Sequence, residues 1–80
     1  MKARITITLK NGVLDPQGKA IEGALHALGF GDVANVRQGK LIEFDIAAGD
    51  DAAARNQLRD MCEKLLANTV IEDYRVEIVG

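Results

Sequence analysis

Polar and apolar residues alternate at both ends of the chain. Near the start, Ile5, Ile7 and Leu9 are separated by polar residues. A period of two is typical of a strand with one buried face, so the pattern predicts a strand over Lys2–Lys10. Residues 74–79 alternate in the same way and predict a final strand with mixed polarity on its outer face.

A first helix is predicted over Pro16–Leu28. Asp15 followed by Pro16 is the pattern of an N-cap and a first helical position. Apolar residues then recur at helical spacing, namely Ile21, Ala24, Leu25 and Leu28. Gly29 follows, where a left-handed C-terminal cap is expected.

Two short strands are predicted in the middle of the chain, over Val33–Gln38 and Leu41–Ile46. Gly39 lies between them and can form the turn of a hairpin. The alternation in the second strand places three apolar side chains on the core face, those of Ile42, Phe44 and Ile46, with Glu43 and Asp45 facing out.

A second helix is predicted after Gly49. Asp50 or Asp51 can cap it and complement its dipole, and Asn68 is the expected stop. Its buried stripe is expected to comprise Leu58, Met61, Cys62 and Leu65.

The resulting order is βαββαβ, which predicts an α+β fold. We expect a two-layer, ferredoxin-like sandwich, with an antiparallel-rich sheet and both helices on one face, as a single domain over residues 1–80. Apolar side chains on the uncovered face or exposed edges would favour burial by a second copy. The candidates for this apolar area are Val13, Leu14, Leu41 and Val79. The chain is therefore expected to form a homodimer or higher oligomer.

Composition narrows the classes of function. Of the 80 residues, 48% are hydrophobic and 28% are charged, which is typical of a folded soluble domain. The net charge of -2 and the near absence of aromatic residues disfavour nucleic-acid binding. There is no signal-like start and no apolar run of about 18 residues, so we expect no membrane association. A single cysteine favours a reducing, cytoplasmic location.

Candidate chemistry is sparse. His26 and Cys62 have no serine to act with, because the chain contains none, and a surface histidine and a packed cysteine are the favoured interpretations. Asp50 and Asp51 could ligate Mg²⁺, although a helix start explains them equally well. The glycines match neither phosphate-binding fingerprint. We therefore assign no catalytic, cofactor-binding or metal-binding residue.

Arg37 and Lys40 flank the predicted hairpin turn. They could hold an anionic ligand or a partner carboxylate, or could be solvated turn charges. An acylphosphatase-like hydrolase would need an arginine in a phosphate-binding first loop, and residues 11–18 contain none.

Four segments occur in an order and spacing that resemble one known family. They are Lys10–Gly18, Ala24–Phe30, Val36–Lys40 and Cys62–Tyr74. Together they are similar to the PurS-type small subunits of phosphoribosylformylglycinamidine synthase, and the resemblance covers nearly the whole chain.

The resemblance implies a non-catalytic subunit of an ATP-dependent, glutamine-using C–N ligase in purine biosynthesis. In such assemblies a glutaminase subunit releases ammonia and a large synthetase subunit uses it, together with ATP and Mg²⁺. The small subunit would bridge the two and assist ammonia transfer, and it would hold no cofactor itself. The alternative that remains open is a stand-alone dimeric module that binds a metabolite.

Turn and helix-end residues without an obvious core role are the candidates for partner contact. They are Asn11, Gly12, Leu14, Asp15, Gln17, Arg37, Lys40, Asn68 and Thr69.

Overall fold

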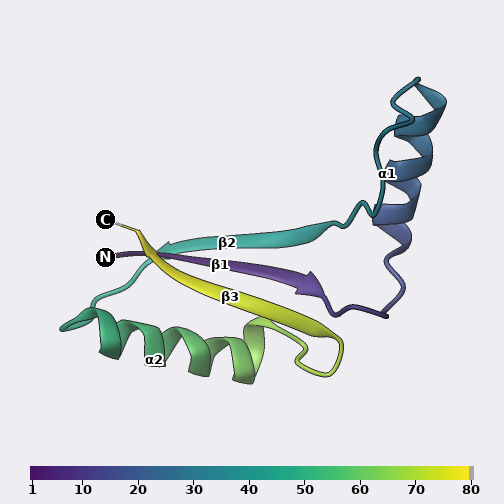
Figure 1. Ribbon diagram of the computed structural model, residues 1–80. Coiled ribbons are helices and arrows are strands. Elements are labelled where there is room, and N and C mark those ends of the chain that lie inside the picture. Colours follow the sequence, from purple (N-terminus) through teal and green to yellow (C-terminus); the bar gives the residue numbers. More distant parts are fainter. Residues whose placement is uncertain (80) are drawn as a thin grey trace.

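A computed structural model describes residues 1–79, so Gly80, the last residue of the expected domain, lies outside the described part. The chain forms three strands and two α-helices, the second of which continues into a π-helical turn (Figure 1). The elements are β1 (Lys2–Leu9), α1 (Pro16–Ala27), β2 (Gly39–Asp45), α2 (Asp51–Met61), η1 (Cys62–Leu66) and β3 (Glu72–Val79). The predicted α+β class with an antiparallel sheet is confirmed.

The sheet has the order β2-β1-β3, and β1 pairs antiparallel with both neighbours. Ile5 lies opposite Ile42 on β2 and Val76 on β3. Directly opposite residues share a face of the sheet, so this row forms part of one apolar face. The period-two pattern of the sequence therefore sets the register.

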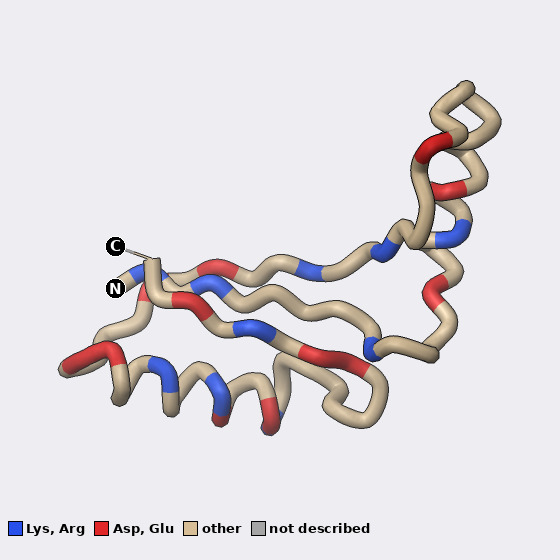
Figure 2. The backbone as a smooth tube through the Cα atoms, viewed as in Figure 1, with Lys and Arg blue, Asp and Glu red and all other residues tan. Residues whose placement is uncertain are grey.

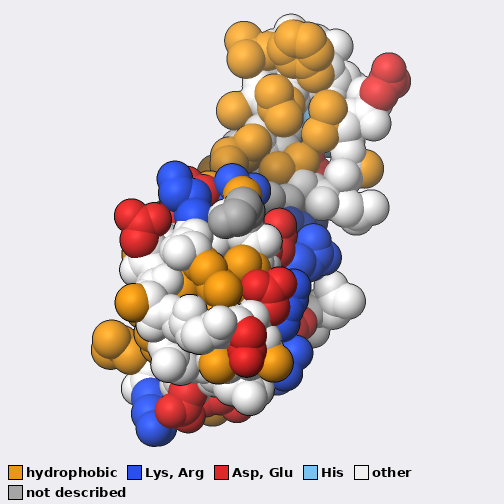
Figure 3. All heavy atoms as spheres, turned by 90° about the vertical axis from the view of Figure 1, so that its left-hand side faces the viewer, with side chains coloured by type: hydrophobic (Ala, Val, Ile, Leu, Met, Phe, Trp, Pro, Cys, Tyr) orange, Lys and Arg blue, Asp and Glu red, His pale blue; other side chains and the backbone are white. Residues whose placement is uncertain are grey.

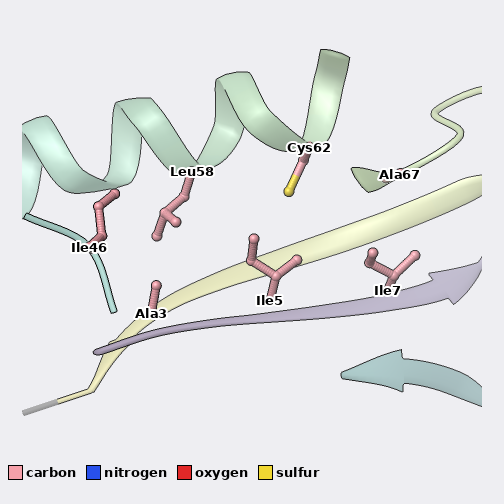
Figure 4. Close-up of a cluster of buried hydrophobic side chains, with 7 residues drawn as sticks. All are labelled: Ala3, Ile5, Ile7, Ile46, Leu58, Cys62 and Ala67. Carbon is pink, nitrogen blue, oxygen red and sulfur yellow. The ribbon is translucent and has the colours of Figure 1, made fainter. Parts of the chain in front are cut away.

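One face of the sheet carries the core. Three side chains of β1 point toward α2, and Leu58 and Cys62 point back toward the sheet (Figure 4). The buried cluster comprises Ala3, Ile5, Ile7, Ile46, Leu58, Cys62 and Ala67. Asp50 caps α2 by accepting a hydrogen bond from the Ala53 amide at 2.7 Å, as predicted for this pair of aspartates.

The predicted burial of Leu65 is wrong, because its side chain is 82% exposed. The π-helical turn is the cause: the Ala67 amide donates to the Cys62 carbonyl oxygen at 3.0 Å, five residues back. A bond of this span inserts one extra residue into the turn. The buried line therefore passes from Leu58 to Cys62 and then to Ala67.

The first helix does not pack on the sheet. Only α2 covers it, whereas α1 extends beyond the end of the sheet and away from α2 (Figure 1). The expectation of two helices on one face is thus wrong for α1. Within its helix the local signals hold, since Pro16 occupies the first turn and Gly29 has a φ of 99°.

The predicted strand over Val33–Gln38 does not form. Two of its amides donate to side chains, that of Val36 to Glu22 and that of Gln38 to Asp15, instead of to a neighbouring strand. Asn35 has a φ of 57°, which interrupts an extended conformation. The hairpin is replaced by a segment that returns along α1.

The uncovered face of the sheet is mainly polar. Arg4 lies between Glu43 and Glu77 on the neighbouring strands, and its Nε lies 2.9 Å from the Glu43 carboxylate. Leu41 and Val79 share this face, but they do not make it a continuous apolar surface. The apolar area expected there lies elsewhere in the molecule.

Candidate partner interface

The residues predicted to contact partners come together at one end of the sheet. This distal end is where β1 finishes and β2 and β3 begin. The Lys10 amide donates to the Ile71 carbonyl oxygen at 2.8 Å, which joins the loop after β1 to the loop before β3. Segments far apart in the sequence thus form one surface.

Asp15 fixes the angle between the distal end and α1. Its Oδ1 accepts a hydrogen bond from the Gly18 amide at 2.9 Å, and its Oδ2 accepts one from the Gln38 amide at 2.9 Å. The Gln38 bond, followed by the Gly18 bond, lowers the pKa of the Asp15 carboxyl below its usual value. One side chain therefore caps α1 and also holds the segment that leads into β2.

Residues 16–38 form a structural unit that we call the arm, which consists of α1 and the return segment 28–38. Glu22 Oε1 accepts a hydrogen bond from the Val36 amide at 3.1 Å, which lowers the pKa of Glu22. His26 is exposed, as predicted, and its Nε2 donates to the Val33 carbonyl oxygen at 2.7 Å. A Cβ on Gly18 would lie 2.5 Å from the Val36 carbonyl oxygen, so the return segment approaches α1 very closely.

Arg37 and Lys40 have different roles at the distal end. The Arg37 guanidinium donates to the Leu9 carbonyl oxygen and so ties the arm to the end of β1. The Lys40 Nζ lies 3.6 Å from the Glu72 carboxylate, and its side chain is 68% exposed. Glu72 also accepts a hydrogen bond from the Asn68 amide at 2.7 Å. Lys40 is therefore held in place while its charge stays accessible.

The remaining predicted residues lie around this framework. Asn68 Oδ1 accepts a hydrogen bond from the Val70 amide at 3.2 Å, which gives this side chain a local structural role. Exposed residues are Asn11, Gly12, Leu14, Gln17 and Thr69. A shallow hollow of about 280 Å³ includes Asp15, Gln17 and Lys40 in its lining. The distal end is thus a polar surface on a fixed backbone.

Sequence reasoning missed two apolar surfaces. The first is a stripe on the arm formed by Ile21, Leu25 and Leu28, which recur at helical spacing. The second is a groove of about 670 Å³ between β2 and the end of α2, whose apolar lining comprises Ile42, Phe44, Met61, Leu65 and Leu66. Helical periodicity reveals the stripe, but the π-helical turn that shapes the groove has no clear sequence signal.

The one thiol is packed in the core. Cys62 has no exposed surface, and burial raises its pKa, so it is held as the neutral, unreactive form. Among residues 1–79, no three His, Cys, Asp or Glu side chains are grouped so that they could hold a metal ion. In the same range no helix has the length and apolarity needed to cross a membrane.

Comparison with known proteins assigns the family. The family model described as PurS, phosphoribosylformylglycinamidine (FGAM) synthase, matches residues 2–80. The chain belongs to the PurS family. The PurS subunit of Synechocystis is 52% identical over 77 residues, which cover 96% of this chain and 77% of that protein.

Solved PurS structures share the fold. Bacillus subtilis PurS has a TM-score of 0.85 and 47% identity, and the match covers 99% of this chain and 98% of that chain. A chain of the structure of PurLQS from Thermotoga maritima has a TM-score of 0.89 and 32% identity, with 98% and 95% coverage. PurS is a non-catalytic subunit of the FGAM synthase complex of purine biosynthesis, in which it works with PurL and PurQ. The resemblance noted in the sequence is therefore confirmed.

Proposed function

We propose that this PurS-family chain is a scaffold that bridges the glutaminase subunit and the large ATP-dependent synthetase subunit through its distal end. The observation that carries the proposal is the concentration of exposed polar groups on a backbone fixed by Asp15, Arg37 and Glu72. Preformed surfaces of this kind lose little conformational entropy on binding. ATP and Mg²⁺ would be used by the large subunit, and this chain would hold no cofactor.

The chemistry of the complex explains the need for a bridge. Ammonia released into water is largely protonated, and the ammonium ion is not a nucleophile. A route between two active sites that excludes water preserves the reactive form. A rigid subunit that contacts both enzymes can keep this route closed, and the cytoplasm is the compartment that we assign to it.

We also propose that the chain acts as a homodimer. Four large apolar side chains of the loop before α1 and of the arm are exposed, including Leu14 at 72%, Leu28 at 73% and Phe30 at 57%. Hydrophobic side chains gather over the arm in Figure 3. Apolar surface of this extent on a small domain is typical of a protein interface.

The bridging role is tested by amidine synthesis with the two larger subunits, in the presence and absence of this chain. We expect the chain to increase synthesis from glutamine while synthesis from added ammonia stays unchanged. If neither reaction responds, the scaffold proposal is wrong, and binding of amino acids and nucleotides to the isolated chain, measured by calorimetry, becomes the next experiment.

The location of the interface is tested by a matched pair of lysine variants. Lys40→Ala removes the accessible charge at the distal end, whereas Lys2→Ala removes an exposed charge at the other end of the sheet. We expect only Lys40→Ala, and more strongly the triple variant Arg37→Ala, Lys40→Ala and Asn68→Ala, to weaken co-elution with the larger subunits. Unchanged co-elution of the triple variant would show that the distal end is not the interface.

A further inference from the structure

The apolar face of the sheet is only partly covered by its own chain. α2 packs against β3 and lies over β1, so the inner side of β2 has no helix above it. Ile42 and Phe44 are half-buried there, and Leu65 at the rim of the groove is 82% exposed. A sheet face of this kind is stable when a second helix packs beside the first.

The arm carries a surface of the same character. Ile21, Leu25 and Leu28 are spaced by four and three residues, so their side chains form one stripe along α1. No charged residue occurs between Glu22 and Asp32, and the tip of the arm is accordingly without coloured charges in Figure 2. An uncharged helix with an apolar stripe is suited to an apolar groove.

The arm of the same chain does not reach the groove. Asp15, Glu22 and Arg37 fasten α1 and the return segment in a direction that leads away from α2. Closing the arm onto its own groove would break the Asp15 and Arg37 bonds, which set its angle to the sheet. The groove and the stripe of one molecule are therefore both left without a partner.

We propose that α1 of a second copy lies in the groove, and that the two copies exchange arms around a two-fold axis. The inference rests on the proposed homodimer and specifies which surfaces form it. A two-fold pair buries both surfaces of both copies, because each copy supplies one stripe and one groove. Each sheet then gains from its partner the second helix that it lacks.

Length and charge agree with this occupant. At 1.5 Å per residue, the 12 residues of α1 span about 18 Å, and the part of α2 and η1 that lines the groove, residues 57–66, spans about 14 Å. The charges at the rim, Asp60 and Lys64, already pair with each other at 2.9 Å. The groove therefore offers no unpaired charge for a charged ligand and favours an apolar helix.

The first test is the oligomeric state of three glutamate variants, measured by light scattering over a range of concentrations. Leu28→Glu places a charge on the stripe and Leu65→Glu places one in the groove. Leu41→Glu is the control, because Leu41 is 59% exposed on the opposite face of the sheet. We expect the first two to weaken dimerisation about 100-fold, since a two-fold dimer carries each substitution twice, and the control to leave it unchanged.

The outcomes separate this inference from the homodimer itself. A monomeric wild-type chain would overturn both. A dimer that survives Leu28→Glu and Leu65→Glu would leave the homodimer standing and overturn the exchange of arms. Loss of co-elution with the larger subunits in Leu65→Glu, while the dimer persists, would show that one of those subunits covers the groove.

A second test asks whether the contact forms between chains. Chains carrying Ile21→Cys, Leu25→Cys or Leu28→Cys are each mixed with Leu65→Cys chains of a different mass and oxidised. We expect at least one mixture to give a disulfide-linked pair that contains both masses, whereas each single variant alone does not. If none of the mixtures links, the arm does not occupy the groove of a second copy.

Discussion

The close approach of the return segment to α1 predicts opposite effects for two glycine-to-alanine changes in the same helix. A Cβ at Gly18 would lie 2.5 Å from the Val36 carbonyl oxygen and 2.7 Å from Asp15 Oδ2. A Cβ at Gly23 would meet nothing within 4 Å. Gly23→Ala is thus a matched control for Gly18→Ala.

The difference between the two variants isolates the cost of the clash. In a helix interior alanine is favoured over glycine by about 1 kcal/mol, and this gain is similar at both sites. Only Gly18→Ala must also move the return segment, and overpacking of this kind costs about 1–3 kcal/mol. We therefore expect the arm of Gly18→Ala to be about 1–3 kcal/mol less stable than that of Gly23→Ala.

Amide hydrogen exchange measures this difference locally. The amides of Val36 and Gln38 are suitable reporters, because they donate to Glu22 and Asp15 across the arm. They should exchange about 5- to 150-fold faster in Gly18→Ala than in Gly23→Ala, while amides of β1 stay equally protected. If both variants protect these amides equally well, the return segment does not pack against α1 and the description of the arm is wrong.

Three further predictions concern stability. The lowered pKa values of Asp15 and Glu22 mean that their stabilisation of the arm is complete above the pKa values of the unfolded chain and is lost as the pH falls below about 4. NMR of arm amides from pH 7 to pH 3 should show this loss before any change in α2, and an arm that is unaffected at pH 3 would contradict it. Leu58→Ala should lower the free energy of unfolding in urea by about 2–5 kcal/mol, because its side chain is fully buried, whereas Val70→Ala in an exposed loop should change it by less than about 0.5 kcal/mol. Lys40→Ala should cost less than about 1 kcal/mol in the same assay, since its ion pair is exposed, and a larger loss would indicate a core role.

The elements with strictly local signals were predictable from the sequence. Alternation fixed the strand that begins near Lys2, and Asp15 with Pro16 fixed the start of α1. Asp50 begins α2 for the same reason, since its side chain satisfies an amide that the helix leaves unpaired. These signals depend on the residue and its immediate neighbours, so they do not require knowledge of the tertiary structure.

The predicted hairpin failed because its backbone bonds are made with distant side chains. Residues 33–38 have the apolar alternation of a strand, but Glu22 and Asp15 accept the hydrogen bonds of the Val36 and Gln38 amides. The carboxylate of Glu22 is 14 residues away from the amide that it binds. Propensity cannot foresee competition of this range, because it depends on how the arm folds back.

The candidate interface was predictable in its members but not in its arrangement. Residues without a core role were identified correctly as a group at turns and helix ends, and the structure brings them to the distal end. Which of them have structural work could not be foreseen: Asp15, Arg37 and Asn68 make hydrogen bonds within the chain. Gln17 and Lys40 remain the more accessible groups for a partner.

The placement of α1 shows what an amphipathic pattern does and does not determine. The spacing of Ile21, Leu25 and Leu28 requires an apolar surface to pack against, and this much follows from the sequence. Nothing in the spacing states whether that surface belongs to the same chain. The direction of the arm is set by the polar bonds of Asp15 and Arg37 at its base, and these bonds point the stripe away from its own sheet. A helix whose hydrophobic pattern demands burial, and whose base prevents burial within the chain, is more consistent with assembly between chains than with an isolated domain.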